Sequence, residues 1–319
     1  MHPLGSEQAG QAIASVSSVC YFFVPESGGG FPRGDDVVMD SDTREQAKRH
    51  TAGNGRLPAV EVEDLTVRRE QPILQDVTWR VERGQHWVVL GPNGSGKTTL
   101  LSTLTAYFPP SSGTVRVAGK EFGRYDWREL RKRIGVVSSA LKRKVSRPVT
   151  TLDMVLSGKE ARINHPGDID AADREQAERI LADLQCAYLR DRPWTYLSQG
   201  ERQRVMIGRA LMSGLEVLIL DEPCAGLDPV ARERFLQFVD GLARRQDAPT
   251  IIFVTHHVEE IMPAFTHVLV LREGRVAASG PKGEVLTPAV LSRAFGVPLE
   301  LTAAGSRYTL KVRLPKETP

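Results

Sequence analysis

Residues 91–98 carry the chemistry of phosphate binding. They read Gly-Pro-Asn-Gly-Ser-Gly-Lys-Thr and follow a short apolar run, Trp87–Leu90. The three glycines let the backbone curl so that successive N–H groups point at phosphate oxygens, and a helix that begins at Lys97 adds the partial positive charge of its N-terminus. This is the P-loop pattern, in which Lys97 reaches the β- and γ-phosphates and Thr98 ligates Mg²⁺. A plain glycine-rich turn would not need the adjacent Lys-Thr pair.

The P-loop predicts that the chain binds a nucleoside triphosphate, but it does not specify the reaction. Kinases, GTPases and many motors share the same loop. The residues predicted to bind the nucleotide are Gly91, Pro92, Asn93, Gly94, Ser95, Gly96, Lys97, Thr98 and Thr99.

Two adjacent acids, Asp221 and Glu222, follow the apolar run 217–220. Such a run is typical of a buried parallel strand, and open α/β sheets keep their ligand crevice at the carboxyl ends of these strands. We expect Asp221 to hold Mg²⁺, directly or through water, and Glu222 to polarise a water molecule for attack on the γ-phosphate. An isolated Asp-Glu pair could equally be a solvated strand end, but the P-loop upstream favours the catalytic interpretation.

Residues 197–204 resemble the signature motif of ABC-type ATPases, whose commonest form is Leu-Ser-Gly-Gly-Gln. The resemblance extends over about residues 59–297, and Gln199 and Glu201 replace the commoner Gly and Gln. It implies that the signature faces ATP held by the P-loop of a second copy, so that the active unit is a head-to-tail dimer around two ATP molecules. A monomer should then hydrolyse ATP poorly. The signature residues are Leu197, Ser198, Gln199, Gly200 and Glu201.

The same resemblance assigns two later positions. Residues 224–228 look like the D-loop that crosses the dimer interface, with Asp228 at its acidic position. His256, after the apolar run 251–254, resembles the switch histidine that contacts the γ-phosphate. A lone histidine at a strand end is more often a surface or capping residue, but its order after the other motifs favours the catalytic role. The predicted catalytic set is Glu222, His256 and Lys97, and His257 is expected to be structural.

The elements that must position these residues predict an α/β protein. The resemblance implies a P-loop NTPase of ABC type, with a RecA-like parallel-sheet core, an antiparallel β subdomain and a helical insert. Alternating apolar residues from Ala59 indicate strands, and Ala177, Ile180, Leu181 and Leu184 recur at helical spacing. We expect a disordered extension at 1–57, an ATPase domain at 58–285 with its helical insert at about 149–196, and a tail at 286–319 that packs on or extends the domain.

Two positions depart from the family pattern. Arg68-Arg69-Glu70 stands where the family usually has an aromatic residue that stacks on adenine, so base selectivity stays open. Ser139 stands in the Q-loop region where glutamine normally helps to ligate Mg²⁺, and the shorter serine is expected to act through water.

Local sequence also resembles two subgroups. The Ser-Ser-Ala-Leu form at 138–141, with Gln85-His86-Trp87, resembles molybdate-transport and photorepair-type ATPases. The tail segments 286–288 and 295–297 resemble ATPases of siderophore, haem or cobalamin importers. The cargo is therefore left open.

Composition limits the class of protein. The chain has 319 residues, a formal net charge of +3 and 41% hydrophobic residues, and its three cysteines show no paired spacing. No apolar run approaches the ~18 to 20 residues of a membrane span, so a membrane role needs a partner chain. The mildly apolar stretch 12–24 has no Lys or Arg before it and is not expected to be a signal peptide. We expect a cytoplasmic location, peripheral on the inner face of the cell membrane.

A basic cluster flanks the Q-loop region, at Arg124, Arg128, Arg131, Lys132, Arg133, Lys142, Arg143, Lys144 and Arg147. In ABC transporters this face meets the membrane subunit, so the charges serve docking or lipid headgroups, or else form a solvated loop. Few aromatic residues interleave with them, so there is no strong nucleic acid signal.

The sequence thus predicts an ATP-binding, ATP-hydrolysing subunit of an ABC transporter, an importer, that dimerises with a second copy and drives integral-membrane permease subunits. The alternative is a soluble ABC-type ATPase in nucleic acid repair, stress or translation. A degenerate nucleotide binder is disfavoured by the intact set Lys97, Asp221, Glu222 and His256.

Overall fold

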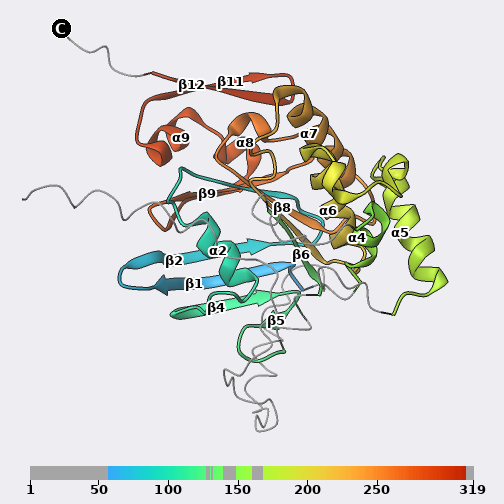
Figure 1. The fold of residues 1–319 in the computed structure, drawn as a ribbon. Helices are drawn as coiled ribbons and strands as arrows, with labels where there is room; N and C mark the ends of the chain where they lie inside the picture. The colour runs from blue at the N-terminus through green and yellow to red at the C-terminus, as the bar shows by residue number, and fades with distance from the viewer. Residues whose placement is uncertain (1–56, 127–129, 131, 139–148, 160–167, 314–319) are drawn as a thin grey trace, which may run out of the picture.

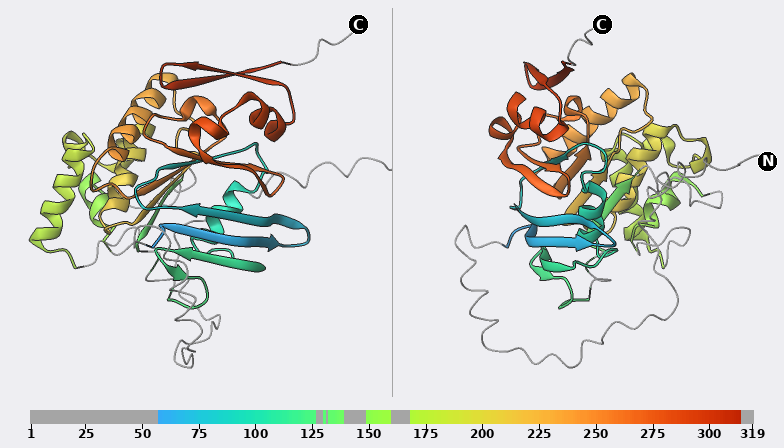
Figure 2. Two further views of the ribbon diagram at one scale, coloured as in Figure 1. Left: turned by 180° about the vertical axis from the view of Figure 1, so that it is seen from behind. Right: turned by 90° about the vertical axis from the view of Figure 1, so that its left-hand side faces the viewer.

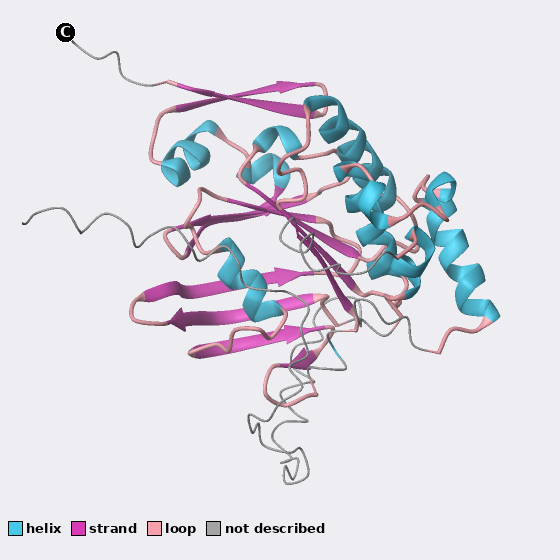
Figure 3. Cartoon of the chain, viewed as in Figure 1, coloured by secondary structure: helices cyan, strands magenta, loops and turns pink. Residues whose placement is uncertain are grey.

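The computed structural model describes residues 57–126, 130, 132–138, 149–159 and 168–313. The predicted extension, apart from its last residue, lies outside the described residues, and so does Ser139. Within the described part, no helix is long and apolar enough to cross a membrane. Figure 1 shows the arrangement of the elements, and Figure 3 distinguishes helices from strands.

A six-stranded sheet forms the centre of the fold, in the order β10-β9-β3-β8-β7-β6. Its interior strands are short, mostly apolar and largely buried, as is usual for parallel strands. β3 pairs in parallel with β8 and β9, and β7 pairs in parallel with β6 and β8, whereas β10 is antiparallel to β9. The strands are β3 (Trp87–Leu90), β6 (Ile134–Ser138), β7 (Val217–Asp221), β8 (Thr250–Thr255), β9 (His267–Arg272) and β10 (Arg275–Pro281).

The register of this sheet brings the predicted motifs to one edge. Leu90, the residue before the P-loop, pairs with Thr255, the residue before His256. Asp221 pairs with Val254 on one side and with Ser138 on the other. The carboxyl ends of four parallel strands therefore end side by side, at the edge where open α/β sheets bind ligands.

A second, antiparallel sheet has the order β2-β1-β4-β5. It is formed by β1 (Val60–Arg68), β2 (Pro72–Val81), β4 (Ser112–Val117) and β5 (Lys120–Glu121). Its inward valines and Trp79 share one core with Leu100, Leu101 and Leu104 of helix α2 (Lys97–Leu104). The helix that begins at Lys97 thus packs on the antiparallel sheet, as Figure 1 shows.

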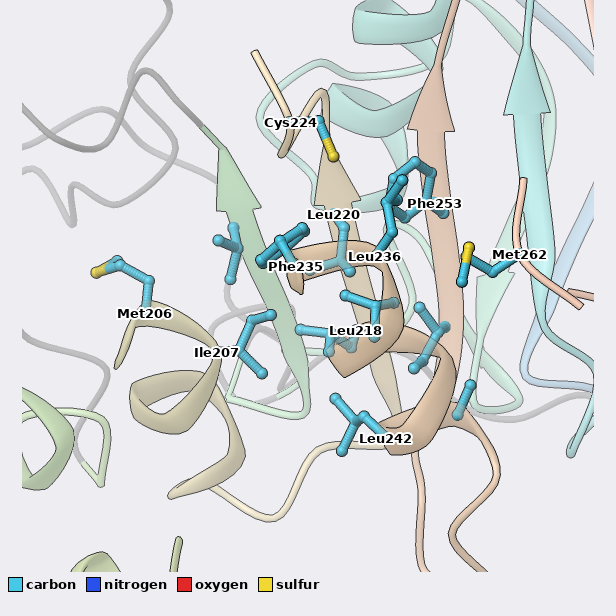
Figure 4. Close-up of a cluster of buried hydrophobic side chains, with 14 of the residues drawn as sticks. Met206, Ile207, Leu218, Leu220, Cys224, Phe235, Leu236, Leu242, Phe253 and Met262 are labelled. Atoms are coloured by element: carbon cyan, nitrogen blue, oxygen red, sulfur yellow. The ribbon is translucent and has the colours of Figure 1, made fainter. Parts of the chain in front are cut away.

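Helices cover the other face of the central sheet. They are α4 (Thr151–Leu156), α5 (Ala171–Asp183), α6 (Gln199–Leu211) and α7 (Pro229–Ala243), with short 3₁₀ turns at Ala187–Leu189 and Trp194–Tyr196. Phe235 and Leu236 of α7 pack onto the apolar side chains of β7 and β8, including Phe253 (Figure 4). The helical spacing predicted around Ala177 corresponds to α5, which buries Ala177 and Leu181 and starts with a capping box at Asp170.

The C-terminal part adds helices and a hairpin beside α7. A 3₁₀ turn, η4 (Val258–Glu260), follows β8, and α8 (Lys282–Val285) and α9 (Pro288–Phe295) follow β10. The chain then forms a two-stranded hairpin of β11 (Leu299–Ala304) and β12 (Arg307–Val312). Figure 2 shows this hairpin above the helices from two further sides. The boundaries predicted for domain, insert and tail stay predictions.

Candidate functional site

The P-loop connects β3 to α2 through two residues in the left-handed region, Gly94 (φ +79°) and Gly96 (φ +101°). Glycine is required at two close approaches, because a Cβ on Gly91 would lie 2.4 Å from the carbonyl oxygen of Leu271 and one on Gly96 would lie 2.6 Å from Leu74. Asn93 and Gly94 are exposed at the tip. The loop therefore forms a cradle of backbone whose shape depends on its glycines.

Lys97 is buried beneath this loop. Its Nζ donates to the carbonyl oxygens of Gly91 at 2.8 Å and Pro92 at 3.0 Å. Burial lowers the pKa of Lys97, and the charges of Glu222 and Asp221 oppose that shift. The ammonium group therefore lies in the field of the predicted catalytic acids.

Open space lies beside the loop tip. A cavity of about 360 Å³ is lined by Pro92, Asn93, Gly94 and Ser95 on one side and by residues near Arg272 and Phe295 on the other. The Ser95 hydroxyl is buried and has no hydrogen-bond partner among the described residues. Thr98 is exposed at the start of α2, the position at which the P-loop pattern expects a ligand of Mg²⁺. A polyphosphate with its Mg²⁺ ion fits this set of donors and ligands.

Asp221 ends β7 at the same edge. Burial raises the pKa of Asp221 to about 6, with a further rise from the charge of Glu222 and a decrease from Lys97. A partly buried carboxylate beside a second carboxylate favours a cation, which would relieve both effects.

Glu222 takes a backbone conformation that is uncommon for a residue with a side chain, with φ at +44°. Its N–H donates to the carbonyl oxygen of Val254 at 3.0 Å, which ties the turn to β8. Left-handed non-glycine residues cost about 1 kcal/mol or more and gather at functional sites. The conformation places Oε1 of Glu222 3.2 Å from Nδ1 of His256.

The neighbours of His256 in the chain form buried polar contacts that the sequence did not predict. The hydroxyl of Thr255 donates to Oε2 of Glu260 at 2.6 Å and accepts from the N–H of His257 at 3.0 Å. Burial raises the pKa of Glu260, and the hydrogen bond from Thr255 opposes the rise. The ring of His257 lies 4.0 Å from that of His256, measured between centroids.

The signature residues begin helix α6. Ser198 is the N-cap, and its hydroxyl accepts from the N–H of Glu201 at 3.3 Å, while Oε2 of Glu201 accepts from the N–H of Ser198 at 2.7 Å. The hydroxyl of Tyr188 donates to the other oxygen of Glu201 at 3.0 Å. The carboxylate that replaces the commoner glutamine therefore completes a capping box.

Two glutamines bind α6 to residues 223–225 of the same chain, where the D-loop begins. The amide of Gln199 donates to the carbonyl oxygen of Ala225 at 2.6 Å, and that of Gln203, one turn later, donates to the carbonyl oxygen of Pro223 at 2.9 Å. Gly226 sits against this contact, since a Cβ there would lie 2.9 Å from Nε2 of Gln199. The link needs the side chain of Gln199, which the commoner glycine lacks.

The D-loop ends at Asp228, which caps α7. Its Oδ1 accepts from the N–H groups of Val230 and Ala231, both at 2.9 Å. Cys224 at the other end of the loop is buried, and burial raises the pKa of its thiol. Cys224 is thus a small buried residue of the core.

At the position of the missing aromatic residue, the guanidinium carbon of Arg69 lies 4.5 Å above the ring of Phe108. Arg69 is exposed, so this contact joins two surface segments. Of the basic cluster, Arg124 pairs with Glu121 at 3.0 Å and Arg133 with Glu216 at 2.8 Å. Ser139 and several members of the cluster lie outside the described residues, although Ser138 directly before it ends β6 beside Asp221.

Known proteins resemble this chain in sequence and in fold. A family model described as ABC transporter matches residues 74–225. Over 230 residues the chain is 44% identical to an uncharacterized ABC transporter ATP-binding protein, YlmA, of Bacillus subtilis, which covers 72% of this chain and 87% of that protein. It is 33% identical over 232 residues to the hemin import ATP-binding protein HmuV of Rhodococcus jostii, covering 72% of this chain and 77% of that protein.

Among solved structures, cbiO1 of Clostridium perfringens, part of the ABC transporter complex cbiONQ, matches with a TM-score of 0.64 at 27% identity, over 74% of this chain and 93% of that one. The P-loop, the paired acids and the signature lie within the residues that the family model matches. The chain belongs to the ABC transporter ATP-binding proteins, a family that hydrolyses ATP.

Proposed function

We propose that the chain is the ATP-hydrolysing subunit of an ABC importer and that it drives separate integral-membrane permease subunits. The observation that carries the hydrolytic part is the convergence of Lys97, Asp221, Glu222 and His256 at one edge of the sheet. Members of this set are linked through the 3.2 Å contact of His256 with Glu222 and through the charges of both acids on Lys97.

The proposed chemistry assigns one task to each group. The P-loop N–H groups and Lys97 bind the phosphates, and Lys97 exchanges its bonds to Gly91 and Pro92 for bonds to phosphate oxygens. Thr98 and Asp221 would hold Mg²⁺, which neutralises charge on the phosphates when bound. Glu222 accepts the proton of the attacking water, and His256 donates toward the γ-phosphate while bonded to Glu222.

Two copies are proposed to complete the site. Ser198 and the N-terminus of α6 form an exposed anion site, because a helix dipole favours negative charge at that end. The ATP on the P-loop of the same chain does not use this anion site. The signature of each copy then faces the ATP of the other copy. The hydrogen bonds of Gln199 and Gln203 couple the position of the signature to the start of the D-loop in the same chain.

The transport role is supported by the relatives, which include a hemin import protein and a structure from a transporter complex. We place the chain in the cytoplasm, on the inner face of the membrane, with the permease as its partner. The finer resemblance to molybdate-transport and photorepair-type ATPases stays a prediction, as does the identity of the cargo.

The proposal is tested in membranes from the native source. The chain should sediment with the membranes and purify in a fixed ratio with one multi-span protein, and the E222Q variant with ATP should retain that partner. A chain found only in the soluble fraction, with salt-sensitive binding to DNA or RNA, would instead support the soluble ATPase.

A further inference from the structure

The hairpin of β11 and β12 docks on two elements that lead away from the catalytic edge. Tyr308 and Leu310 of β12 are partly buried against the main core. β12 packs beside η4, the turn directly after His256 and His257. Figure 1 shows the hairpin lying next to α7.

Arg307 makes the polar part of this docking. Its Nη1 donates to both carboxylate oxygens of Glu233 on α7, at 2.9 and 3.1 Å. Its Nη2 donates to the carbonyl oxygen of Glu259 in η4, at 2.7 Å. One guanidinium thus joins the two elements, with hydrogen bonds that are shorter and stronger than neutral ones.

Glu259 is bound a second time. Its Oε1 accepts from the N–H of Leu310 at 3.0 Å, so both its main chain and its side chain are attached to β12. The bond from Arg307 lowers the pKa of Glu233, as expected for a carboxylate held by a guanidinium.

Each anchored element lies shortly after a residue of the proposed site. Helix α7 begins immediately after Asp228 of the D-loop, and Glu233 lies in its second turn. Glu259 is the middle residue of η4, and only His257 and Val258 separate it from His256. Movement of η4 would therefore move the imidazole relative to Glu222.

We propose that the C-terminal hairpin, through Arg307, is a clamp that positions His256 for ATP hydrolysis. Arg307 is a positioning residue: it acts by fixing Glu259 to α7, and so holds the segment after His256 at a constant distance from the D-loop helix. This inference rests on the proposed role of His256 and extends the catalytic unit beyond the ATPase core into the tail.

The clamp predicts a loss of turnover without a loss of nucleotide affinity. In the full-length chain, Arg307→Ala should lower kcat for ATP by about five- to tenfold, the equivalent of losing one ordinary hydrogen bond. Binding of a non-hydrolysable ATP analogue should change less than about twofold, because the P-loop is untouched. Arg307→Lys keeps the charge but lacks the planar guanidinium that donates to Glu233 and Glu259 together. Its kcat should therefore lie between those of the wild type and the alanine variant.

The matched control is Arg313→Ala. Arg313 is on the same hairpin and pairs with Glu300, but its bonds in the described part of the chain do not reach α7 or η4. Its kcat should remain within about twofold of wild type. Amide hydrogen exchange of residues 257–260 should accelerate in Arg307→Ala and stay unchanged in Arg313→Ala.

A double-mutant cycle separates positioning from general damage. His256→Ala should lower kcat strongly, and adding Arg307→Ala to it should cause no further loss, since the clamp acts only through His256. A full additional loss in the double variant would overturn the clamp, as would an unchanged kcat in Arg307→Ala. An unchanged kcat in His256→Ala would overturn the role of His256 itself, which is the failure of the proposed site rather than of the clamp alone.

Discussion

Nδ1 of His256 lies 3.2 Å from Oε1 of Glu222, although 33 residues separate them in the chain. The contact follows from the sheet, because β7 and β8 are parallel neighbours, and Asp221, the last residue of β7, pairs with Val254, two residues before His256. Both side chains are about one third exposed. They therefore meet at the surface, at the sheet edge where the P-loop follows β3. The left-handed conformation of Glu222 completes the approach.

Replacing Glu222 by Gln should separate binding from turnover. The amide keeps the shape of the side chain but cannot accept a proton, so ATP binding should persist while kcat falls by about 10²-fold or more. Steady-state ATPase assays and nucleotide binding by calorimetry measure the two effects. Glu175→Gln, on the exposed face of α5, is the control and should leave kcat unchanged. Hydrolysis at the wild-type rate by the Glu222 variant would exclude it as the base.

Ser198→Ala should impair turnover by more than its loss as a helix cap explains. Loss of an N-cap costs about 1 kcal/mol of stability, and Asp170→Ala removes the same kind of capping box from α5. Urea denaturation should show a similar decrease in the free energy of unfolding for both variants. Only the Ser198 variant should lose ATPase activity; an equal loss in both would reduce Ser198 to a structural cap.

Asp221 should make the metal-free, nucleotide-free protein more stable at low pH. Its pKa is about 6 in the folded chain against 3.8 as the ordinary value. The folded state therefore binds more protons between about pH 4 and 6, and the stability from this group is present below that window and lost as the pH rises through 6.

Asp221→Asn removes this dependence. Its free energy of unfolding, relative to wild type, should increase across the window by at most about 1.4 kcal/mol per pH unit. With ATP and Mg²⁺ at pH 7 the order should reverse, because the variant loses a charged metal ligand. Parallel pH profiles for the two proteins without metal would contradict the assignment of the raised pKa.

Gln199 and Gln203, which bind α6 to residues 223–225, should contribute differently to the free energy of unfolding. Gln203 is fully buried, so Gln203→Ala leaves the carbonyl of Pro223 without its donor and should cost about 1 to 3 kcal/mol. Gln199 is half-exposed, and its alanine variant should cost about 1 kcal/mol or less. Urea denaturation compares them, and equal costs would argue against burial as the cause.

Local patterns predicted the elements that carry the motifs. The apolar runs before residue 91 and before Asp221 are strands of the central sheet, and the helix expected from Lys97 begins there. Their order implied the family, and the parallel sheet then brings the P-loop, the acids and His256 to one edge. Each of these signals lies in consecutive residues, where hydrophobic pattern and glycine geometry are decisive.

Side-chain contacts between segments that are far apart in the chain cannot be recognised from a pattern of consecutive residues. The bonds of Gln199 to Ala225, of Thr255 to Glu260 and of Arg307 to Glu233 depend on the side-chain arrangement of the folded protein. The charges of Arg307 and Glu233 are visible in the sequence, but the two residues lie 74 positions apart. The tail was expected to pack on or extend the domain; its attachment behind His256 emerges only from the structure.

The composite site is tested most directly by mixing two inactive variants. Lys97→Ala removes the P-loop half and Ser198→Arg blocks the signature half, so each alone should lose at least about 10²-fold in turnover. In a mixed dimer, the P-loop of the Ser198 variant meets the intact signature of the Lys97 variant. If the site is composite, ATPase activity should return on mixing and rise with protein concentration; a mixture as inactive as its separate components would contradict a composite site.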